Sequence, residues 1–202
     1  MILTTPLKES QVRTLKAGDN VTINGSIFTG RDKIHKYLFD QKPPDEDIPF
    51  NLAGGIIYHC GPLVKRIEND GNTEYTFISS GPTTSARLDM YAWKLIKEYE
   101  IRAIIGKGGM GPKTIKAMKE HGCVYLHAIS GAGVYLADRV KSVTAVWKLE
   151  EFGVPEAMWH IEVEYFPAIV TMDSYGNSLH EDIKNTSIEK AKEILSKPLE
   201  IK

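Results

Sequence analysis

Residues 78–89 link a predicted strand to a predicted helix and read Ile78-Ser79-Ser80-Gly81-Pro82-Thr83-Thr84-Ser85-Ala86-Arg87-Leu88-Asp89. The preceding residues 75–78 are aromatic and β-branched, which is typical of a buried strand, and the Gly-Pro pair ends that strand. From Leu88 to Tyr99, apolar residues recur at three- and four-residue spacing, which predicts a helix near residues 84–99 with one apolar face.

The start of this helix carries groups that attract anions. Thr83 or Thr84 is placed to cap the first turn, whose free N–H groups favour negative charge. Arg87 follows Thr83 by four residues, so the hydroxyl and the guanidinium can reach the same side of the helix and the same ligand. The alternative interpretation is a capping threonine beside a solvated arginine.

A glycine-rich loop with a second cation follows the predicted strand at residues 101–105. It reads Gly106-Lys107-Gly108-Gly109-Met110-Gly111-Pro112, and so many glycines suit a chain that takes positive φ or comes close to a ligand. The loop is superficially similar to a nucleotide-binding P-loop. We reject that interpretation because Pro112 displaces the required Lys-Ser/Thr pair and removes an N–H donor. Pro112 instead suits the first position of a helix that Gly122 can end.

A third strand-like segment also ends in glycine followed by a cation, Gly30-Arg31, before a helical pattern. Taken singly, Arg31, Arg87 and Lys107 are each compatible with solvated charges at loop and helix ends. Taken together, the three cations at three strand ends predict a clamp for a dicarboxylate or a phosphate.

These motifs carry a resemblance to a known family. Gly30-Arg31-Asp32, residues 81–89 and residues 106–110 resemble the signatures of the beta subunit, or C-terminal domain, of class I iron-sulfur fumarases and L-tartrate dehydratases. The similarity extends from Leu3-Thr4-Thr5-Pro6-Leu7 to Asp173-Ser174-Tyr175-Gly176-Asn177, nearly the whole chain. It implies a swivelling β/β/α domain.

The resemblance also implies roles for individual residues. Thr83 is the candidate for proton transfer at the substrate carbon, activated by an aspartate of a separate alpha subunit. Its alternative role is a helix cap. The implied substrate-binding residues are Arg31, Arg87, Lys107, Gly81 and Thr84. His59 is expected to be structural, since polar groups beside a glycine-proline turn commonly satisfy local backbone.

The composition bounds the fold and the partners. A chain of 202 residues with 42% apolar content can bury one sizeable core, so we expect an α/β fold forming one domain over residues 1–202. The formal net charge of -1 gives no general attraction to nucleic acid or to anionic membranes. No segment is apolar enough for a membrane span or a signal peptide, so we expect a cytoplasmic protein.

The organisation along the chain predicts parallel βαβ units in the middle. Strands near residues 75–79, 101–105 and 123–128 alternate with helices. Asp70-Gly71 is typical of a hairpin turn, and residues 183–195 are predicted to form a terminal helix.

Two cysteines, Cys60 and Cys123, are too few for a dehydratase-type cluster, which needs three thiolates, and no metal site is expected on this chain. The resemblance implies that a separate alpha subunit carries the 4Fe-4S cluster, in a hetero-oligomer such as two alpha and two beta subunits.

The predicted reaction is reversible hydration of fumarate to L-malate, a step of the tricarboxylic acid cycle, by a hydro-lyase whose other half is the alpha subunit. Two alternatives stay open. One is the beta subunit of L-tartrate dehydratase, because the motifs do not distinguish the extra hydroxyl of tartrate. The other is a non-catalytic anion-binding module.

Overall fold

The computed structural model of the chain describes residues 1–69 and 71–196. The strands are β1 (Ile2–Thr4), β2 (Asn20–Thr29), β3 (Ile56–Tyr58), β4 (Leu63–Asn69), β5 (Asn72–Ser79), β6 (Ala103–Gly106), β7 (Val124–His127), β8 (Val140–Trp147) and β9 (Met158–Met172). The helices are α1 (Glu9–Val12), α2 (Asp32–Gln41), α3 (Asp89–Glu98), α4 (Pro112–His121), α5 (Gly133–Ala137), α6 (Leu149–Phe152) and α7 (Leu179–Leu195), with 3-10 turns η1 (Asp45–Asp47) and η2 (Ser85–Leu88). The prediction of an α/β fold is confirmed.

The main sheet has the strand order β1-β2-β3-β6-β7-β9-β8, and β9 also pairs with β2. The first five of these strands are mutually parallel, whereas β9 runs antiparallel to β2, β7 and β8. Because β9 is bonded to both β2 and β7, the strands β2, β3, β6, β7 and β9 close into a barrel-like ring. Closure gives these strands hydrogen-bonding neighbours on both edges.

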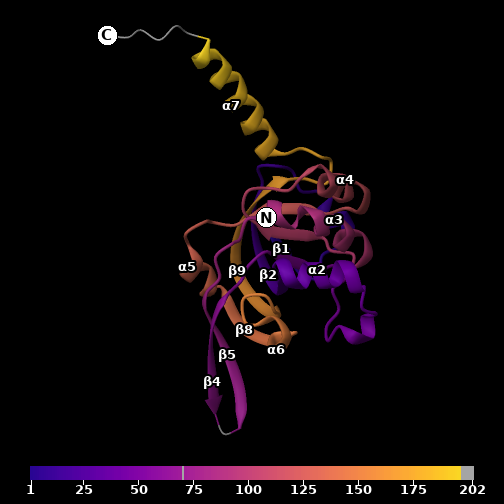
Figure 1. Cartoon of the computed structure of the whole chain (residues 1–202), viewed down its shortest axis with the longest axis vertical. Coiled ribbons are helices and arrows are strands. Elements are labelled where there is room, and N and C mark those ends of the chain that lie inside the picture. Colours follow the sequence, from indigo (N-terminus) through magenta and orange to yellow (C-terminus); the bar gives the residue numbers. More distant parts are fainter. Residues whose placement is uncertain (70, 197–202) are drawn as a thin grey trace, which may run out of the picture.

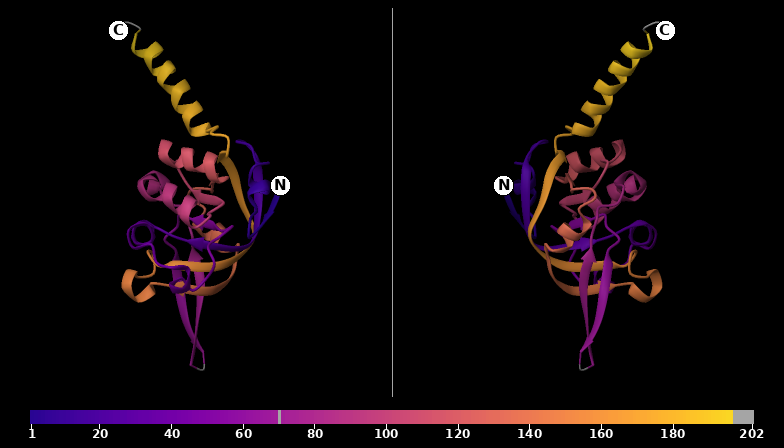
Figure 2. Two further views of the ribbon diagram at one scale, coloured as in Figure 1. Left: turned by 90° about the vertical axis from the view of Figure 1, so that its right-hand side faces the viewer. Right: turned by 90° about the vertical axis from the view of Figure 1, so that its left-hand side faces the viewer.

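Alternate residues of the central strands face two separate cores. In β6, Ile105 packs into the core that also holds Trp159, while Ile104 packs beneath helices α2, α3 and α4. All of β6 is buried, as expected for a parallel strand covered on both faces. Figure 2 shows the three helices stacked along one side of the sheet.

The predicted βαβ unit of residues 101–128 is confirmed, since β6 and β7 are parallel and α4 lies between them in the chain. The prediction that residues 75–79 belong to the same parallel arrangement is wrong. They form β5, which pairs antiparallel with β4 in a two-stranded ribbon. Within β5 only Phe77 is buried. The aromatic and β-branched residues of this strand therefore belong to an exposed ribbon and not to a core strand. The ribbon agrees with the predicted hairpin, although Asp70 lies outside the described residues.

Helix α7 extends away from the rest of the chain at the end opposite to the β4–β5 ribbon (Figure 1). It includes the predicted helix of residues 183–195, and none of its described residues is buried. Within residues 1–69 and 71–196, no helix combines the length and the apolar character needed to cross a membrane.

Candidate active site

The carboxyl ends of four parallel strands meet at one edge of the sheet. Backbone hydrogen bonds continue across this edge beyond the strands themselves: Gly30 N–H donates to Tyr58, His59 N–H to Ile105 and Ala128 N–H to Gly106, over 2.8–3.0 Å. In α/β sheets such an edge is the usual position of ligand sites. We call it the strand-end edge.

The segment of Thr83, Thr84 and Ser85 lies on this edge as if it were one more strand. Thr83 N–H donates to His59 O over 2.7 Å, and Lys107 N–H donates to Thr83 O over 3.2 Å. Ser85 N–H returns to Lys107 O over 3.0 Å. The structure therefore brings together predicted residues that lie more than twenty positions apart in the chain.

The two threonines do not cap a helix, so that prediction is wrong. The chain forms the 3-10 turn η2 before α3 begins, and Thr84, at the position before η2, makes no capping bond with its exposed side chain. The half-buried Thr83 directs Oγ1 to Arg87, whose Nη2 donates to it over 3.1 Å. The hydroxyl and the guanidinium therefore do face the same side, although by a different local geometry.

The guanidinium of Arg87 has N–H donors that are not used within the described residues. Its Nη2 also donates to Asp32 Oδ2 over 3.1 Å, and the two side chains of this ion pair are 49% and 43% exposed. An ion pair so exposed contributes little to stability, which leaves the guanidinium available to a stronger anion. Among residues 1–69 and 71–196, Arg87 makes hydrogen bonds through Nη2 alone. Its Nε and Nη1 keep free donors, and either can form a two-bond contact with a carboxylate that replaces Asp32 at the neighbouring Nη2.

Arg31 is held differently. It lies at the same edge, at the start of α2, but its Nε faces Glu156 Oε1 at 3.5 Å. A Cβ placed on Gly61 would come within 2.5 Å of the Arg31 side chain, so the guanidinium packs closely against that glycine. Arg31 thus has a carboxylate partner of its own, and its connection to Arg87 runs through the adjacent Asp32.

Lys107 carries an uncompensated charge. Its ammonium forms no ion pair with any described residue, and its side chain is half-buried. The loop beyond it needs glycine, because Gly108 and Gly109 have φ of +85 and +76. A Cβ on Gly109 would also lie 2.7 Å from the ring of His180. The structure therefore supports the predicted need for glycine here.

The glycine loop leads into α4 as predicted, with Gly111 before the helix, Pro112 at its first position and Gly122 ending it in the left-handed conformation. The N-terminus of α4 is occupied from within the chain. Asp89 accepts hydrogen bonds from Gly111 N–H over 2.7 Å and from Thr114 Oγ1 over 2.6 Å. An anionic ligand is therefore not needed at this helix start.

Sequence reasoning missed a buried group beneath the Thr83 segment. Ser85 is fully buried, and its Oγ lies 2.8 Å from His59 Nδ1 and 2.8 Å from the Tyr125 hydroxyl. Burial, and then the neighbouring His35, hold the pKa of His59 well below its usual value, so the imidazole is neutral. Local pattern gives no signal for this group because its members are 26 and 40 residues apart.

The predicted structural role of His59 agrees with its complete burial. Its ring contacts the Ser85 side chain, however, and not the local backbone that the sequence suggested. Its own carbonyl accepts the Thr83 N–H described above. One residue thus contacts the Thr83 segment at both ends.

The chain does not by itself fit an iron-sulfur cluster. Cys60 and Cys123 are both buried and unpaired, and burial raises the pKa of Cys60 to about 12 and also raises that of Cys123. Cluster ligands are thiolates, three for a cluster with one open iron. Among residues 1–69 and 71–196, no group of three or more His, Cys, Asp or Glu side chains is arranged to hold a metal ion.

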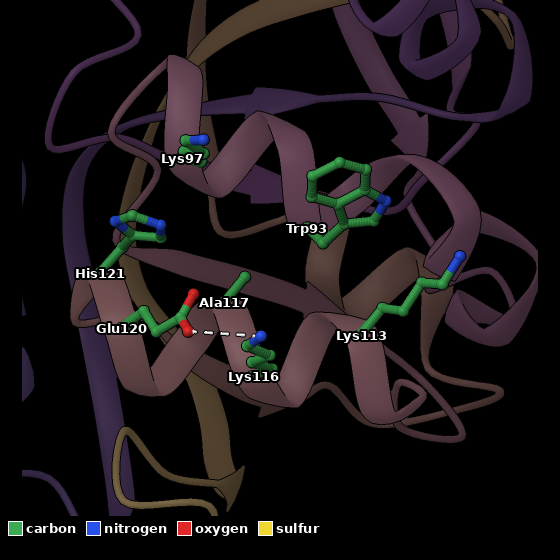
Figure 3. Close-up of a pocket in the computed structure, with 7 residues that line it drawn as sticks. All are labelled: Trp93, Lys97, Lys113, Lys116, Ala117, Glu120 and His121. Carbon is green, nitrogen blue, oxygen red and sulfur yellow. Dashed lines mark ion pairs between the residues drawn. The ribbon is translucent and has the colours of Figure 1, made fainter.

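A separate groove of about 490 Å³ lies between α3 and α4 (Figure 3). Trp93 and Lys97 extend into it from α3, and Lys116 forms an ion pair with Glu120 across 3.7 Å at its α4 side. The groove shares no residue with the predicted site. We therefore locate the candidate site at the strand-end edge.

At the carboxyl ends of the parallel strands, the Thr83 hydroxyl contacts Arg87, and the backbone of Thr83 bonds to that of Lys107, whose ammonium has no ion-pair partner among the described residues. Such an arrangement can hold a small anion with two separated negative groups. The class of protein is therefore an α/β domain with cationic side chains and hydroxyls at its strand-end edge.

The chain belongs to the family described as "Fumarase C-terminus", whose model matches residues 1–183. It is 56% identical over 188 residues to a Geobacillus stearothermophilus protein named "Putative fumarate hydratase class I". It is 42% identical over 190 residues to a Methanocaldococcus jannaschii protein named "Putative L(+)-tartrate dehydratase subunit beta". It is 33% identical over 191 residues to the Escherichia coli protein named "L(+)-tartrate dehydratase subunit beta".

The lengths of these relatives differ. Each match covers 93% or 94% of this chain. The chain spans only 35% of the Geobacillus protein, but 95% and 90% of the two tartrate dehydratase beta subunits. The family thus occurs both within a longer protein and as a subunit of about the size of this chain.

Proposed function

We propose that residues 1–202 act as one domain, the beta subunit of a two-subunit hydro-lyase that reversibly hydrates fumarate to L-malate. The observation that carries the proposal is the meeting of Thr83, Arg87 and the unpaired Lys107 at the strand-end edge. The 56% identity to a protein named as a fumarate hydratase supports fumarate as the substrate.

The cations answer the charge that develops during the reaction. Removing water from malate requires loss of a proton from the carbon next to a carboxylate, which adds negative charge to a dianion. Arg87 and Lys107 hold the two carboxylates, Arg87 through the donors that Asp32 and Thr83 leave free. Arg31, although paired with Glu156, adds positive potential at the same edge. Gly81 and Thr84 add polar contacts to the substrate from the segment that contains Thr83.

Thr83 transfers the proton at carbon. In the dehydration direction its oxygen accepts the proton from the substrate carbon while its own proton passes to a carboxylate of the partner subunit. An unaided threonine hydroxyl is a poor base, so this second carboxylate is required. The Arg87 Nη2 at 3.1 Å from Thr83 Oγ1 favours negative charge on the oxygen during the transfer.

The partner is an alpha subunit that carries a 4Fe-4S cluster, since the two buried cysteines of this chain do not fit one. When bound, the cluster supplies Lewis-acid chemistry at the substrate hydroxyl. We assign the active form to a cytoplasmic hetero-oligomer, for example of two alpha and two beta subunits.

The second candidate substrate is L-tartrate. The relatives that support it are 42% and 33% identical, and this chain spans 95% and 90% of their lengths. Their names and sizes favour a stand-alone beta subunit, whereas the higher identity favours fumarate. The carboxylate clamp serves both substrates, so the two candidates differ in how the second hydroxyl of tartrate is accommodated.

The test is anaerobic co-expression of this chain with its alpha subunit, followed by parallel assays on fumarate, malate and tartrate. We expect turnover of fumarate and malate by the complex and none by either chain alone. Lys107→Met should weaken substrate binding, whereas Lys113→Met, in the separate groove, should not. Turnover of tartrate alone would replace fumarate as the substrate. Binding of dicarboxylates without turnover by a cluster-loaded complex would favour the non-catalytic module.

A further inference from the structure

The Ser85 hydroxyl joins three parts of the strand-end edge. Tyr125, in β7, donates to Ser85 Oγ over 2.8 Å, and burial raises the pKa of the phenol, which therefore stays a donor. The neutral His59 Nδ1, just after β3, lies 2.8 Å from the same oxygen. A hydroxyl can donate once and accept twice, so Ser85 satisfies both neighbours. We call Ser85, His59 and Tyr125 the Ser85 cluster.

The fit around this cluster is close. A Cβ on Gly106 would lie 1.9 Å from Ser85 Oγ and 2.9 Å from the Tyr125 hydroxyl. Gly106 leaves space for the Ser85 side chain and is also the residue directly before Lys107. The packing of Ser85 against Gly106 therefore fixes the start of the loop that carries Lys107. A side chain at position 106 would separate the Thr83 and Lys107 segments.

We propose that the Ser85 cluster is a positioning device that sets Thr83 and Lys107 in register with each other for the reaction. Ser85 is tied through its side chain to β3 and β7 and through its N–H to Lys107 O, over 3.0 Å. Thr83 and Lys107 take their places from those ties and from the Thr83 O to Lys107 N–H bond. The proposal rests on the proposed function, which makes these two residues the ones that face the substrate.

The cluster acts without touching the substrate. The side chains of Ser85, His59 and Tyr125 are all fully buried. Removing the Ser85 hydroxyl leaves two buried polar groups without their partner and releases the Thr83 segment from the core. A displacement of about 1 Å at a reacting group can cost roughly a hundredfold in rate. The expected effect is thus on turnover more than on folding.

The first experiment is independent of activity and measures amide hydrogen exchange in the isolated chain. Ser85→Ala should raise the exchange rates of the N–H groups at positions 83, 85 and 107 by about tenfold or more, because each bond crosses the released segment. The matched control is Ser174→Ala, which removes another buried hydroxyl, one with no hydrogen-bond partner among the described residues. Unchanged exchange at all three positions in Ser85→Ala would overturn the proposal.

The second experiment uses the complex with the alpha subunit. Tyr125→Phe should lower kcat by about tenfold per folded enzyme, whereas Tyr99→Phe, which removes a buried hydroxyl bonded to Leu38 O, should not. His59→Asn keeps a polar atom near the Nδ1 position and should restore much of the kcat lost in His59→Leu. Faster exchange with unchanged kcat would overturn the positioning role. An inactive wild-type complex would instead contradict the proposed function, while the exchange result would still decide whether the cluster clamps the two segments.

Discussion

The strand-end edge and helix α7 are held in opposite ways. At the edge, residues from five separate parts of the chain bond to one another, and the fully buried side chains of His59 and Tyr125 lie directly beneath the Thr83 segment. Helix α7 has no buried residue, and Ile183, Ile194 and Leu195 are 68%, 67% and 83% exposed. An isolated helix of this length is marginal in water, so α7 belongs to the low-stability end of the molecule.

This contrast predicts where substitutions should matter. At the edge each atom serves several partners, so a small change is transmitted to Thr83, Arg87 or Lys107. In α7 beyond its first turn, a change affects mainly the helix itself. The contrast can be tested from the largest expected effect to the smallest.

Thr83→Val should have the largest effect. It keeps the shape of the side chain but removes the proposed proton-transfer oxygen, so kcat of the complex should fall by about 10²–10⁴-fold. Stability should stay within about 1 kcal/mol, because Thr83 caps no helix. Exchange of the substrate C–H with solvent should fall together with kcat. Thr76→Val, on the exposed face of β5, is the control, and wild-type exchange in Thr83→Val would move the base to the partner subunit.

The edge should be acid-sensitive through His35. Burial is the main influence on His35 and lowers its pKa to about 4, although the hydrogen bond to the Arg31 carbonyl and the charge of Asp32 both act to raise it. Between about pH 6.5 and pH 4 the unfolded chain therefore binds more protons than the folded chain, and stability falls as pH is lowered. The loss from this group approaches about 3 kcal/mol near pH 4 and is absent above pH 6.5.

Urea unfolding across this pH range measures the effect. His35→Asn retains a donor for the Arg31 carbonyl but has no group that titrates, so its stability should fall less steeply with acid than that of the wild type. The buried His59 contributes in the same direction and keeps part of the slope in the variant. Equal slopes for the two proteins would show that His35 is not protonated on unfolding in this range.

Arg87→Lys should cost about a hundredfold in kcat/KM. The charge is kept, but an ammonium cannot reproduce the planar two-bond contact with a carboxylate. Folding should be unaffected because the pair with Asp32 is half-exposed. Arg66→Lys, in the exposed pair with Glu68 on the β4–β5 ribbon, controls for the chemistry of the change. Wild-type kinetics in Arg87→Lys would identify Arg87 as a solvated residue.

Removing residues 184–202 should have the smallest effect. The family match ends at residue 183, and α7 buries nothing, so the Tm of the remainder should change by less than about 2 °C. His180→Ala is the informative contrast within the same helix, since His180 bonds to Thr171 Oγ1 over 2.9 Å and packs against Gly109. It should destabilise more than the deletion. A large drop in Tm on deletion would contradict the claim that α7 contributes less to stability than the strand-end edge.

The same contrast explains what could be predicted from sequence. Helix α7 and the ends of α4 at Pro112 and Gly122 were predictable because their signals are local: apolar spacing, a first-turn proline and a left-handed glycine. The cations at the strand ends were also predictable, because each follows a glycine after a strand-like run. The roles that the resemblance implies for these residues stay predictions.

Contacts between distant segments were not predictable. Asp89 reads as an ordinary first-turn acid, yet it occupies the start of a different helix, α4. Arg31 reads like Arg87, yet it faces Glu156, 125 positions along the chain. The strand of residues 72–79 has the composition of a core strand but, within the part of the chain that the structure describes, pairs only with its neighbour β4. In each case the decisive partner is chosen by the tertiary fold and leaves no trace in the local pattern.

Strand β9 has a consequence for the order of folding. Its residues 160–169 pair with β2 near the beginning of the chain, and residues 169–172 pair with β7. The ring therefore cannot close until residues up to Met172 have left the ribosome, and closure joins segments some 130 positions apart, as in the Phe28 to His160 pair. Such non-local pairing slows folding, because loop-closure entropy is lost before the contacts form. Until then the nascent chain exposes the edges of β2 and β7 that later pair with β9.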